Sequence, residues 1–363
     1  MGNIIDYVKN YNNITFDKKS FNEIDSLVLS QFIYLKFENI KDMINNEIKI
    51  ADLFKYIDII TKKTRNEKNN IKLLSLMSKG NRYKNIILSD ICPIIDFKNE
   101  QQYFSAVFKL NKNIYYIAYR GTDSSLVGWK EDYNISFMKN IPSQISALNY
   151  FEKIANKYKN ATFYLGGHSK GANIAVYAGI YAKKELKNKI LKIYDHDGPG
   201  FLSEVLSSKE FEDIEFKIEK TVPKTAIIGL LFEQHSSYTV IDSSGFLMFQ
   251  HDPYNWKIEN NNFIKLKNVD RLSQYTNKTL HKWLLSTDIK TRELFINSLY
   301  DIIYQDNIYS FSELWSNLNN YKIILNKIKN LDPKIKNLIK ETLKELIFIS
   351  KEEAKSYFKD IIK

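Results

Sequence analysis

A serine between two glycines has a setting that could support covalent chemistry. Ser169 stands in the run Gly167–Gly171 (GHSKG), after a predicted buried strand over 162–166 and at the start of a predicted helix over 171–186. A serine on such a strand-to-helix turn projects above the sheet, because glycines two residues either side let strand and helix approach. The helix N-terminus adds backbone N–H groups and partial positive charge. The pattern predicts Ser169 as a nucleophile.

A nucleophilic serine needs a base, and the base needs a carboxylate that fixes its tautomer. Around such a turn the partners follow in the order Ser, Asp or Glu, His. Of the five histidines, His168 adjoins the serine and is expected to pack or hydrogen-bond under the turn, and His196 precedes nearly every candidate acid. His251 follows a predicted strand over 246–249 and opens a loop, so it is the leading candidate base. The remaining candidates are His235 and His281.

The acid is less well determined by the sequence than the base. Asp197 follows a predicted strand over 190–194 and precedes a Gly-Pro-Gly turn, where it could equally be a turn-forming residue. Glu219 follows the next predicted strand, over 214–218, and Asp242 is a weaker third candidate. Asp197 leads, but the choice between Asp197 and Glu219 stays open.

Backbone N–H groups must also stabilise the negative oxygen that forms when a serine attacks a carbonyl group. One donor is the N–H of Lys170, the residue after the nucleophile. A second is expected from Thr122, in a loop that follows a predicted strand over 114–119. The N–H of Thr122, helped by its hydroxyl, is the natural choice.

These segments resemble those of class 3 (fungal-type) lipases, and in particular a bacterial branch of that family. The segment Arg120–Ser125 (RGTDSS), followed by Gly128–Asp132 (GWKED), is similar to the oxyanion segment of the family. Further similar segments are Gly166–Asn173, Asp197–Phe201, Gln250–Pro253, Gly2–Tyr7 and Phe21–Asp25.

The resemblance covers roughly residues 1–260. It implies an α/β-hydrolase fold with Ser169 as nucleophile, His251 as base, and Thr122 and Lys170 as oxyanion donors. The chain departs from typical class 3 lipases at the acid, because no aspartate follows the predicted strand over 214–218.

The elements that must position these residues alternate between strands and helices. Residues 20–85 have helical spacing, strands are predicted over 86–88, 104–110 and 238–241, and a helix over 142–158. Such alternation predicts a mostly parallel sheet with helices on both faces. From about residue 272 the pattern is nearly all helical. We expect a hydrolase domain over 1–285 and a helical extension over 286–363.

Composition narrows the function further. The 363 residues carry a net charge of +11, but no window has the basic stripe with interleaved aromatics that nucleic-acid binding needs. The single cysteine, Cys92, excludes an internal disulfide and suits a reducing compartment. Neither a signal peptide nor an apolar run of ~20 residues stands out. We expect a soluble cytoplasmic protein without a metal or organic cofactor.

The predicted activity is hydrolysis of an ester of a lipid or a small carboxylic acid through an acyl-Ser169 intermediate. A thioesterase or peptidase is the alternative within the same chemistry. A non-catalytic interaction protein on a hydrolase scaffold is the alternative from another class. The amphipathic helices of 286–363 are expected to pack on the core, with a partner or a membrane surface as the alternative role.

Overall fold

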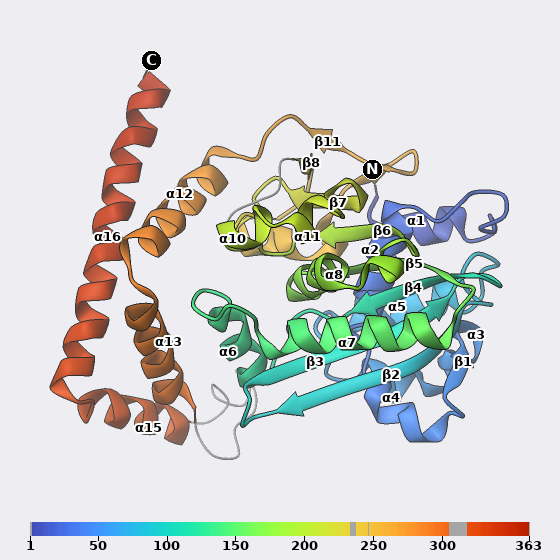
Figure 1. Cartoon of the computed structure of the whole chain (residues 1–363), viewed down its shortest axis with the longest axis horizontal. Coiled ribbons are helices and arrows are strands. Elements are labelled where there is room, and N and C mark those ends of the chain that lie inside the picture. Colours follow the sequence, from blue (N-terminus) through green and yellow to red (C-terminus); the bar gives the residue numbers. More distant parts are fainter. Residues whose placement is uncertain (1, 233–236, 246, 305–317, 363) are drawn as a thin grey trace. The chain divides into compact units, whose positions relative to one another are not determined.

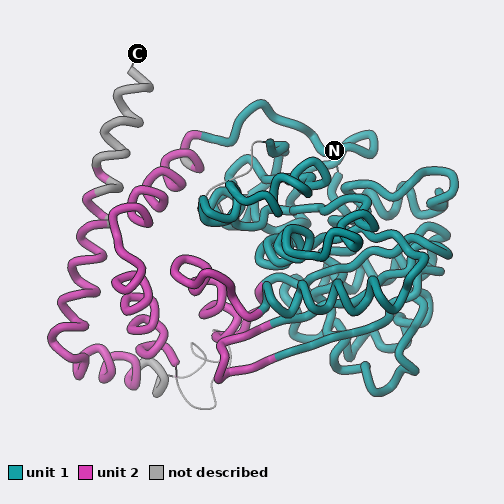
Figure 2. The backbone as a smooth tube through the Cα atoms, in the orientation of Figure 1, with its two compact units in different colours: residues 1–94, 103–121, 143–270 teal, residues 95–102, 122–142, 271–363 magenta. Residues whose placement is uncertain are grey.

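The computed structural model describes residues 2–232, 237–245, 247–304 and 318–362. Its chain forms two compact units, each with an apolar core of its own. Unit 1 consists of residues 1–94, 103–121 and 143–270, and unit 2 of residues 95–102, 122–142 and 271–363 (Figure 2). Ser169, His251 and Asp197 all belong to unit 1.

A nine-stranded sheet forms the centre of the fold, and along most of it the strands follow one another in chain order, β1-β2-β3-β4-β5-β6-β7-β8-β11. Its strands are β1 (Glu47–Lys49), β2 (Ile87–Asp96), β3 (Gln101–Lys109), β4 (Ile114–Tyr119), β5 (Thr162–His168), β6 (Ile190–His196), β7 (Ile218–Pro223), β8 (Thr239–Ile241) and β11 (Lys265–Leu266). Strands β9 (Ile258–Glu259) and β10 (Asn262–Phe263) form a separate antiparallel pair.

The large sheet is mixed rather than mostly parallel throughout. Strands β4 to β8 pair in parallel, so their carboxyl ends share one edge. The pairs β1–β2, β3–β4 and β8–β11 are antiparallel. Because β5, β6 and β7 are neighbours, residues that follow them in the chain come together at that edge.

Helices cover both faces of this sheet (Figure 1). On one face the hydroxyls of Ser26 and Ser30, from α2 (Glu23–Phe32), lie 3.0 and 2.7 Å from the Tyr116 hydroxyl. Three residues along β4, Tyr119 points to the other face and donates to the Ala147 carbonyl of α7 (Pro142–Lys157). Side chains three apart on a strand face opposite ways, so β4 is buried on both sides. A mixed sheet between two helical layers is compatible with an α/β-hydrolase fold.

The first helices of unit 1 begin at asparagine caps. The Asn3 side chain accepts the Ile5 N–H, and the Asn22 side chain accepts the N–H groups of Ile24 and Asp25, so both satisfy donors that a helix start leaves free. Besides α2 and α7, the described α-helices of unit 1 are α1 (Ile4–Tyr11), α3 (Ile50–Leu53), α4 (Ile57–Thr61), α5 (Glu67–Met77), α8 (Lys170–Tyr181), α9 (Lys184–Lys187), α10 (Ser203–Leu206) and α11 (Lys209–Glu212).

Unit 2 is built largely from helices and joins three segments, the last of which is far from the other two in the sequence. Trp283, Phe295 and Ile296 form a core against which Phe137 and Ile339 also pack. Its helices are α6 (Leu126–Asn134), α12 (Arg271–Ser286), α13 (Ile289–Ile303), α15 (Leu318–Lys329) and α16 (Pro333–Ile362). The boundary predicted at residue 285 stays a prediction.

Two predicted strands differ from the structure in ways that bear on the site. The strand predicted over 214–218 is wrong, because a 3₁₀ turn occupies Glu215–Lys217 and β7 begins at Ile218. The strand predicted over 246–249 is also wrong, because Leu247–His251 form a 3₁₀ turn; residue 246 lies outside the described residues. Phe249 is 70% exposed, so this apolar run does not bury its side chains as a strand in the sheet would.

Within the described part of the chain, we find no helix that combines the length and the hydropathy needed to cross a membrane.

Candidate active site

Ser169 occupies the sharp turn between β5 and α8, and its backbone conformation is strained. Its φ is 60° and its ψ is −134°, a region that residues with a side chain rarely adopt. The Ser169 N–H donates to the carbonyl of His196 at 3.0 Å, which ties the turn to the end of β6. The side chain is half-buried. Such strain, held by neighbouring strands, is typical of functional serines on strand-to-helix turns.

The two flanking glycines are required by space. A Cβ atom at Gly167 would lie 2.4 Å from the backbone of Gly171, and one at Gly171 would lie 2.2 Å from the carbonyl oxygen of Tyr119. Real Cβ atoms do not approach other atoms so closely, so a side chain at either position would push the turn away from β4. The two glycines therefore let the strand and the helix approach each other, as the sequence pattern predicts.

His251 and Asp197 form a buried pair. The Nδ1 atom of His251 lies 2.6 Å from Oδ2 of Asp197, and both side chains are nearly inaccessible. A carboxylate is an acceptor, so Nδ1 carries the proton and Nε2 is left as the basic nitrogen. The second carboxylate oxygen, Oδ1, is buried without a hydrogen-bond partner among the described residues. The negative charge of Asp197 is therefore directed mainly at the imidazole.

The loop that carries Asp197 is held from several sides. Asp197 has a φ of 55°, and its N–H donates to the Thr221 carbonyl of β7 at 2.8 Å. Asp195 accepts the Gly198 N–H at 2.9 Å and an Nζ–H of Lys220 at 3.0 Å, and Lys220 also donates to the Gly198 carbonyl. Both members of this ion pair are buried.

Asn173 of α8 holds the far end of the same loop. Its side-chain amide donates to the carbonyls of Pro199 and Gly200, each at 3.0 Å, and its side-chain oxygen accepts from Gln144 at 2.9 Å. The helix that begins beside Ser169 thus also fixes the loop of Asp197. Sequence reasoning did not assign Asp195, Lys220 or Asn173 to the site, because the predicted strand ended at residue 218 and left Lys220 outside it.

Contacts through His196 and His168 link Ser169 to the His251–Asp197 pair. The Ser169 N–H is bonded to His196, which directly precedes Asp197. The ring of His168, the residue before Ser169, lies 4.4 Å from the ring of His251 between centroids. Ser169 and Asp197 thus directly follow the ends of β5 and β6, and the His251 ring lies beside that of His168. The expected contact between His251 and the Ser169 hydroxyl stays a prediction.

The predicted oxyanion segment begins next to Ser169. A Cβ at Gly121 would lie 2.5 Å from the His168 carbonyl oxygen and 3.2 Å from Cβ of Ser169, so only glycine leaves room there. The preceding Arg120 is buried, donates to the carbonyls of Ile33 and Leu35, and lies over the Phe104 ring. These contacts fix the start of the loop.

The two predicted oxyanion donors differ in what their side chains do. Within unit 2, the Thr122 hydroxyl lies 2.6 Å from both carboxylate oxygens of Asp132. The Thr122 hydroxyl therefore donates its proton to Asp132. The prediction that this hydroxyl helps to stabilise the negative oxygen is wrong, and only the backbone N–H of Thr122 stays a candidate. Lys170 is the first residue of α8 and directly follows Ser169.

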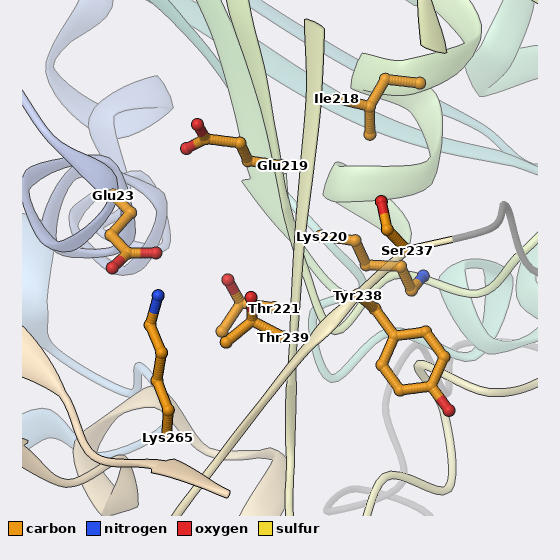
Figure 3. Close-up of a pocket in the computed structure, with 9 residues that line it drawn as sticks. All are labelled: Glu23, Ile218, Glu219, Lys220, Thr221, Ser237, Tyr238, Thr239 and Lys265. Carbon is orange, nitrogen blue, oxygen red and sulfur yellow. The ribbon is translucent and has the colours of Figure 1, made fainter. Parts of the chain in front are cut away.

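Glu219, the alternative acid, lies elsewhere. It is the second residue of β7, not the residue after a strand, and its side chain is 41% exposed and paired with Lys192. It lines a polar cavity of about 350 Å³. Figure 3 shows Glu219 among the lining residues, together with Glu23 and Lys265. Asp242, the third candidate, binds Lys257 at 2.7 Å.

The remaining histidines have other settings. His196 is buried, its Nε2 lies 2.9 Å from the Ser26 hydroxyl, and burial lowers its pKa to about 3. His281 lies on α12 in unit 2. His235 lies outside the described residues.

Cys92 lies on β2 as a free thiol whose pKa is raised by burial.

Comparisons with known proteins add the following. A family model described as Mbeg1-like matches residues 77–301, more than half of the chain. A crystal structure of M37 lipase is similar with a TM-score of 0.37 and 15% sequence identity, covering 58% of this chain and 70% of that one. No curated protein matches the chain.

Proposed function

Because the chain belongs to the Mbeg1-like family and carries a buried His251–Asp197 pair beside a strained Ser169, we propose that it is a serine hydrolase of the α/β-hydrolase fold. Its substrate is a carboxylic ester, of a lipid or a small acid. The single observation that carries the proposal is the 2.6 Å contact between His251 Nδ1 and Asp197 Oδ2. A histidine so oriented presents Nε2 as a base.

The reaction proceeds by acyl transfer. His251 Nε2 takes the hydroxyl proton of Ser169 as Oγ attacks the ester carbonyl, and the Asp197 carboxylate stabilises the imidazolium that forms. The backbone N–H group of Lys170 stabilises the negative oxygen of the tetrahedral intermediate. The second donor expected from the sequence is the N–H of Thr122. His251 then gives its proton to the leaving alcohol.

Water releases the acyl group in the second half. His251 Nε2 removes a proton from water, which attacks the acyl-Ser169 carbonyl, and the proton returns to Oγ as the free acid leaves. Apart from the substrate and water, every step uses groups that belong to this chain. A thioester or an amide would follow the same route with a thiol or an amine as leaving group.

Labelling with a fluorophosphonate tests the proposal without knowledge of the substrate, because the probe reacts only with an activated serine. We expect the wild-type protein to be labelled at Ser169, as identified by peptide mass spectrometry. Ser169→Ala should fold normally by circular dichroism and remain unlabelled. Labelling of a different residue would refute the assignment. A folded wild-type protein that is not labelled would favour the non-catalytic interaction protein.

A further inference from the structure

His168, the residue before Ser169, is a buried histidine that the reaction above does not use. Its Nε2 atom lies 2.7 Å from the carbonyl oxygen of His251. A carbonyl oxygen can only accept, so Nε2 carries the proton and donates it. The turn between β5 and α8 is thereby bonded directly to the main chain of the proposed base.

The rest of the His168 ring also faces the base. The two imidazole rings lie 4.4 Å apart between centroids at an interplanar angle of 38°. The other nitrogen of His168, Nδ1, lies 3.4 Å from the Tyr34 hydroxyl. These contacts give His168 one orientation and present its ring to His251.

The carbonyl before His251 is held in the same way. Trp256 Nε1 donates to the carbonyl of Gln250 at 2.9 Å, and the Trp256 ring lies 6.3 Å from the His168 ring. Two consecutive carbonyls of a short 3₁₀ turn are therefore fixed by buried ring N–H donors. A turn held like this at Gln250 and His251 leaves the base little freedom to drift.

We propose that His168 is a positioning residue, which sets the place of the base His251 through the hydrogen bond to its carbonyl oxygen. The inference rests on the proposed serine-hydrolase function, and it adds a fourth residue to the nucleophile, base and acid. Its effect is geometric: a base displaced by a fraction of an ångström transfers the serine proton less efficiently.

The charge state of His168 is compatible with this role. Burial, and next the charge on His251, lower the pKa of His168 well below its usual value. His168 therefore stays neutral and keeps Nε2–H as a donor while the neighbouring His251 gains a proton. A second cation at this place would oppose the imidazolium that the reaction needs.

Two substitutions of His168 separate its hydrogen bond from its packing. In His168→Gln the side-chain Nε2 can occupy the place of the imidazole Nε2 and donate to the same carbonyl. In His168→Phe the ring is kept and the donor is lost. We expect His168→Phe to lower kcat on an activated ester and the rate of fluorophosphonate labelling by about tenfold to a hundredfold, with KM within about twofold. His168→Gln should stay within about threefold of the wild-type protein.

The outcomes distinguish the two proposals. A wild-type protein that is not labelled would overturn both. A labelled wild-type protein with His168→Phe equally fast, or with His168→Gln as slow as His168→Phe, would overturn the role of His168 alone. A rise in KM at constant kcat would overturn it as well. Should His168→Phe fail to fold, His168→Asn gives the same comparison, because its shorter amide does not reach the His251 carbonyl.

Discussion

Asp197 and Glu219 are both carboxylates near the ends of neighbouring strands, yet their surroundings differ sharply. Asp197 is 1% exposed at its side chain, whereas Glu219 is 41% exposed and paired with a lysine. A carboxylate stabilises an imidazolium best where water does not screen it. The difference in burial therefore favours Asp197 as the orienting acid.

Asp197→Asn is expected to slow hydrolysis of an activated ester by roughly a thousandfold or more, because the amide favours the wrong imidazole tautomer. The matched control is Glu219→Gln, which should change the rate by less than about twofold. Steady-state kinetics of both variants on one ester make the comparison. A crippled Glu219→Gln beside a near-normal Asp197→Asn would show that the acid is misassigned.

The buried histidines also make stability depend on pH. Burial lowers the pKa of His196 to about 3 in the folded protein, whereas a histidine in the unfolded chain has a pKa of about 6.5. Between these values the unfolded state binds a proton that the folded state does not. His196 therefore has no effect on the free energy of unfolding above about pH 6.5. As the pH decreases from there towards about 3, His196 lowers that free energy by about 1.4 kcal/mol per pH unit.

His196→Phe is expected to remove this contribution, although losing the bond to Ser26 lowers its stability overall. The free energy of unfolding of the variant, measured with urea from pH 7 to pH 4, should fall less steeply than that of the wild-type protein by about 1.4 kcal/mol per pH unit. The other titrating groups are present in both proteins. Parallel pH dependences would contradict the neutral state of His196.

At the scale of single elements, the sequence predicted the positions of β2 to β6 and of β8 but misplaced β7, which carries the alternative acid Glu219. The alternating run before Ile218 is typical of a strand, yet a 3₁₀ turn precedes β7. That shift moves Glu219 into the strand and away from its carboxyl end. Local alternation cannot show where pairing with β6 begins, because register depends on contacts distant in the sequence.

The residues that hold the candidate site were harder to predict than the three residues proposed to react. Ser169, His251 and Asp197 follow from residue type, order and a turn pattern. The buried pair of Lys220 with Asp195 joins two strands, and nothing in either segment indicates the other. Such pairings require the sheet order, which a single sequence does not contain.

Lys220→Met tests the importance of this pair. Removing one partner of a buried ion pair leaves an uncompensated charge, so we expect a loss of about 3–5 kcal/mol in the free energy of unfolding. Lys192→Met removes an exposed partner of Glu219 on the adjoining strand and should cost less than about 1 kcal/mol. Urea unfolding of both variants gives the comparison. Equal losses would mean that the buried pair does not hold the Asp197 loop.

At the scale of the whole molecule, each of the two compact units has apolar clusters of its own among the described residues. The helical pattern after about residue 272 was predicted, but its association with residues 122–142 was not. Phe137 and Ile339, about two hundred residues apart in the sequence, pack against the same core. Periodicity indicates which side of a helix is apolar, and not which distant segment covers that side.

Two large-to-small substitutions address the two cores separately. Phe295→Ala should destabilise unit 2 and Leu27→Ala unit 1, each by about 2–5 kcal/mol. If the units unfold separately, differential scanning calorimetry should show two transitions, each lowered by one variant only. A single transition that both variants lower together would instead show that the chain unfolds as one cooperative body.

The strained backbone of Ser169 has a consequence for how selection acts on this chain. A residue with φ near 60° and ψ near −134° costs about 1–3 kcal/mol, and glycine would relieve most of that cost. Ser169→Gly should therefore unfold in urea at a free energy about 1 kcal/mol above that of Ser169→Ala, which keeps the strain. Equal stabilities would show that the turn is relaxed. Selection for stability alone would replace this serine with glycine, and selection for catalysis alone retains it, so the two pressures oppose each other at one residue.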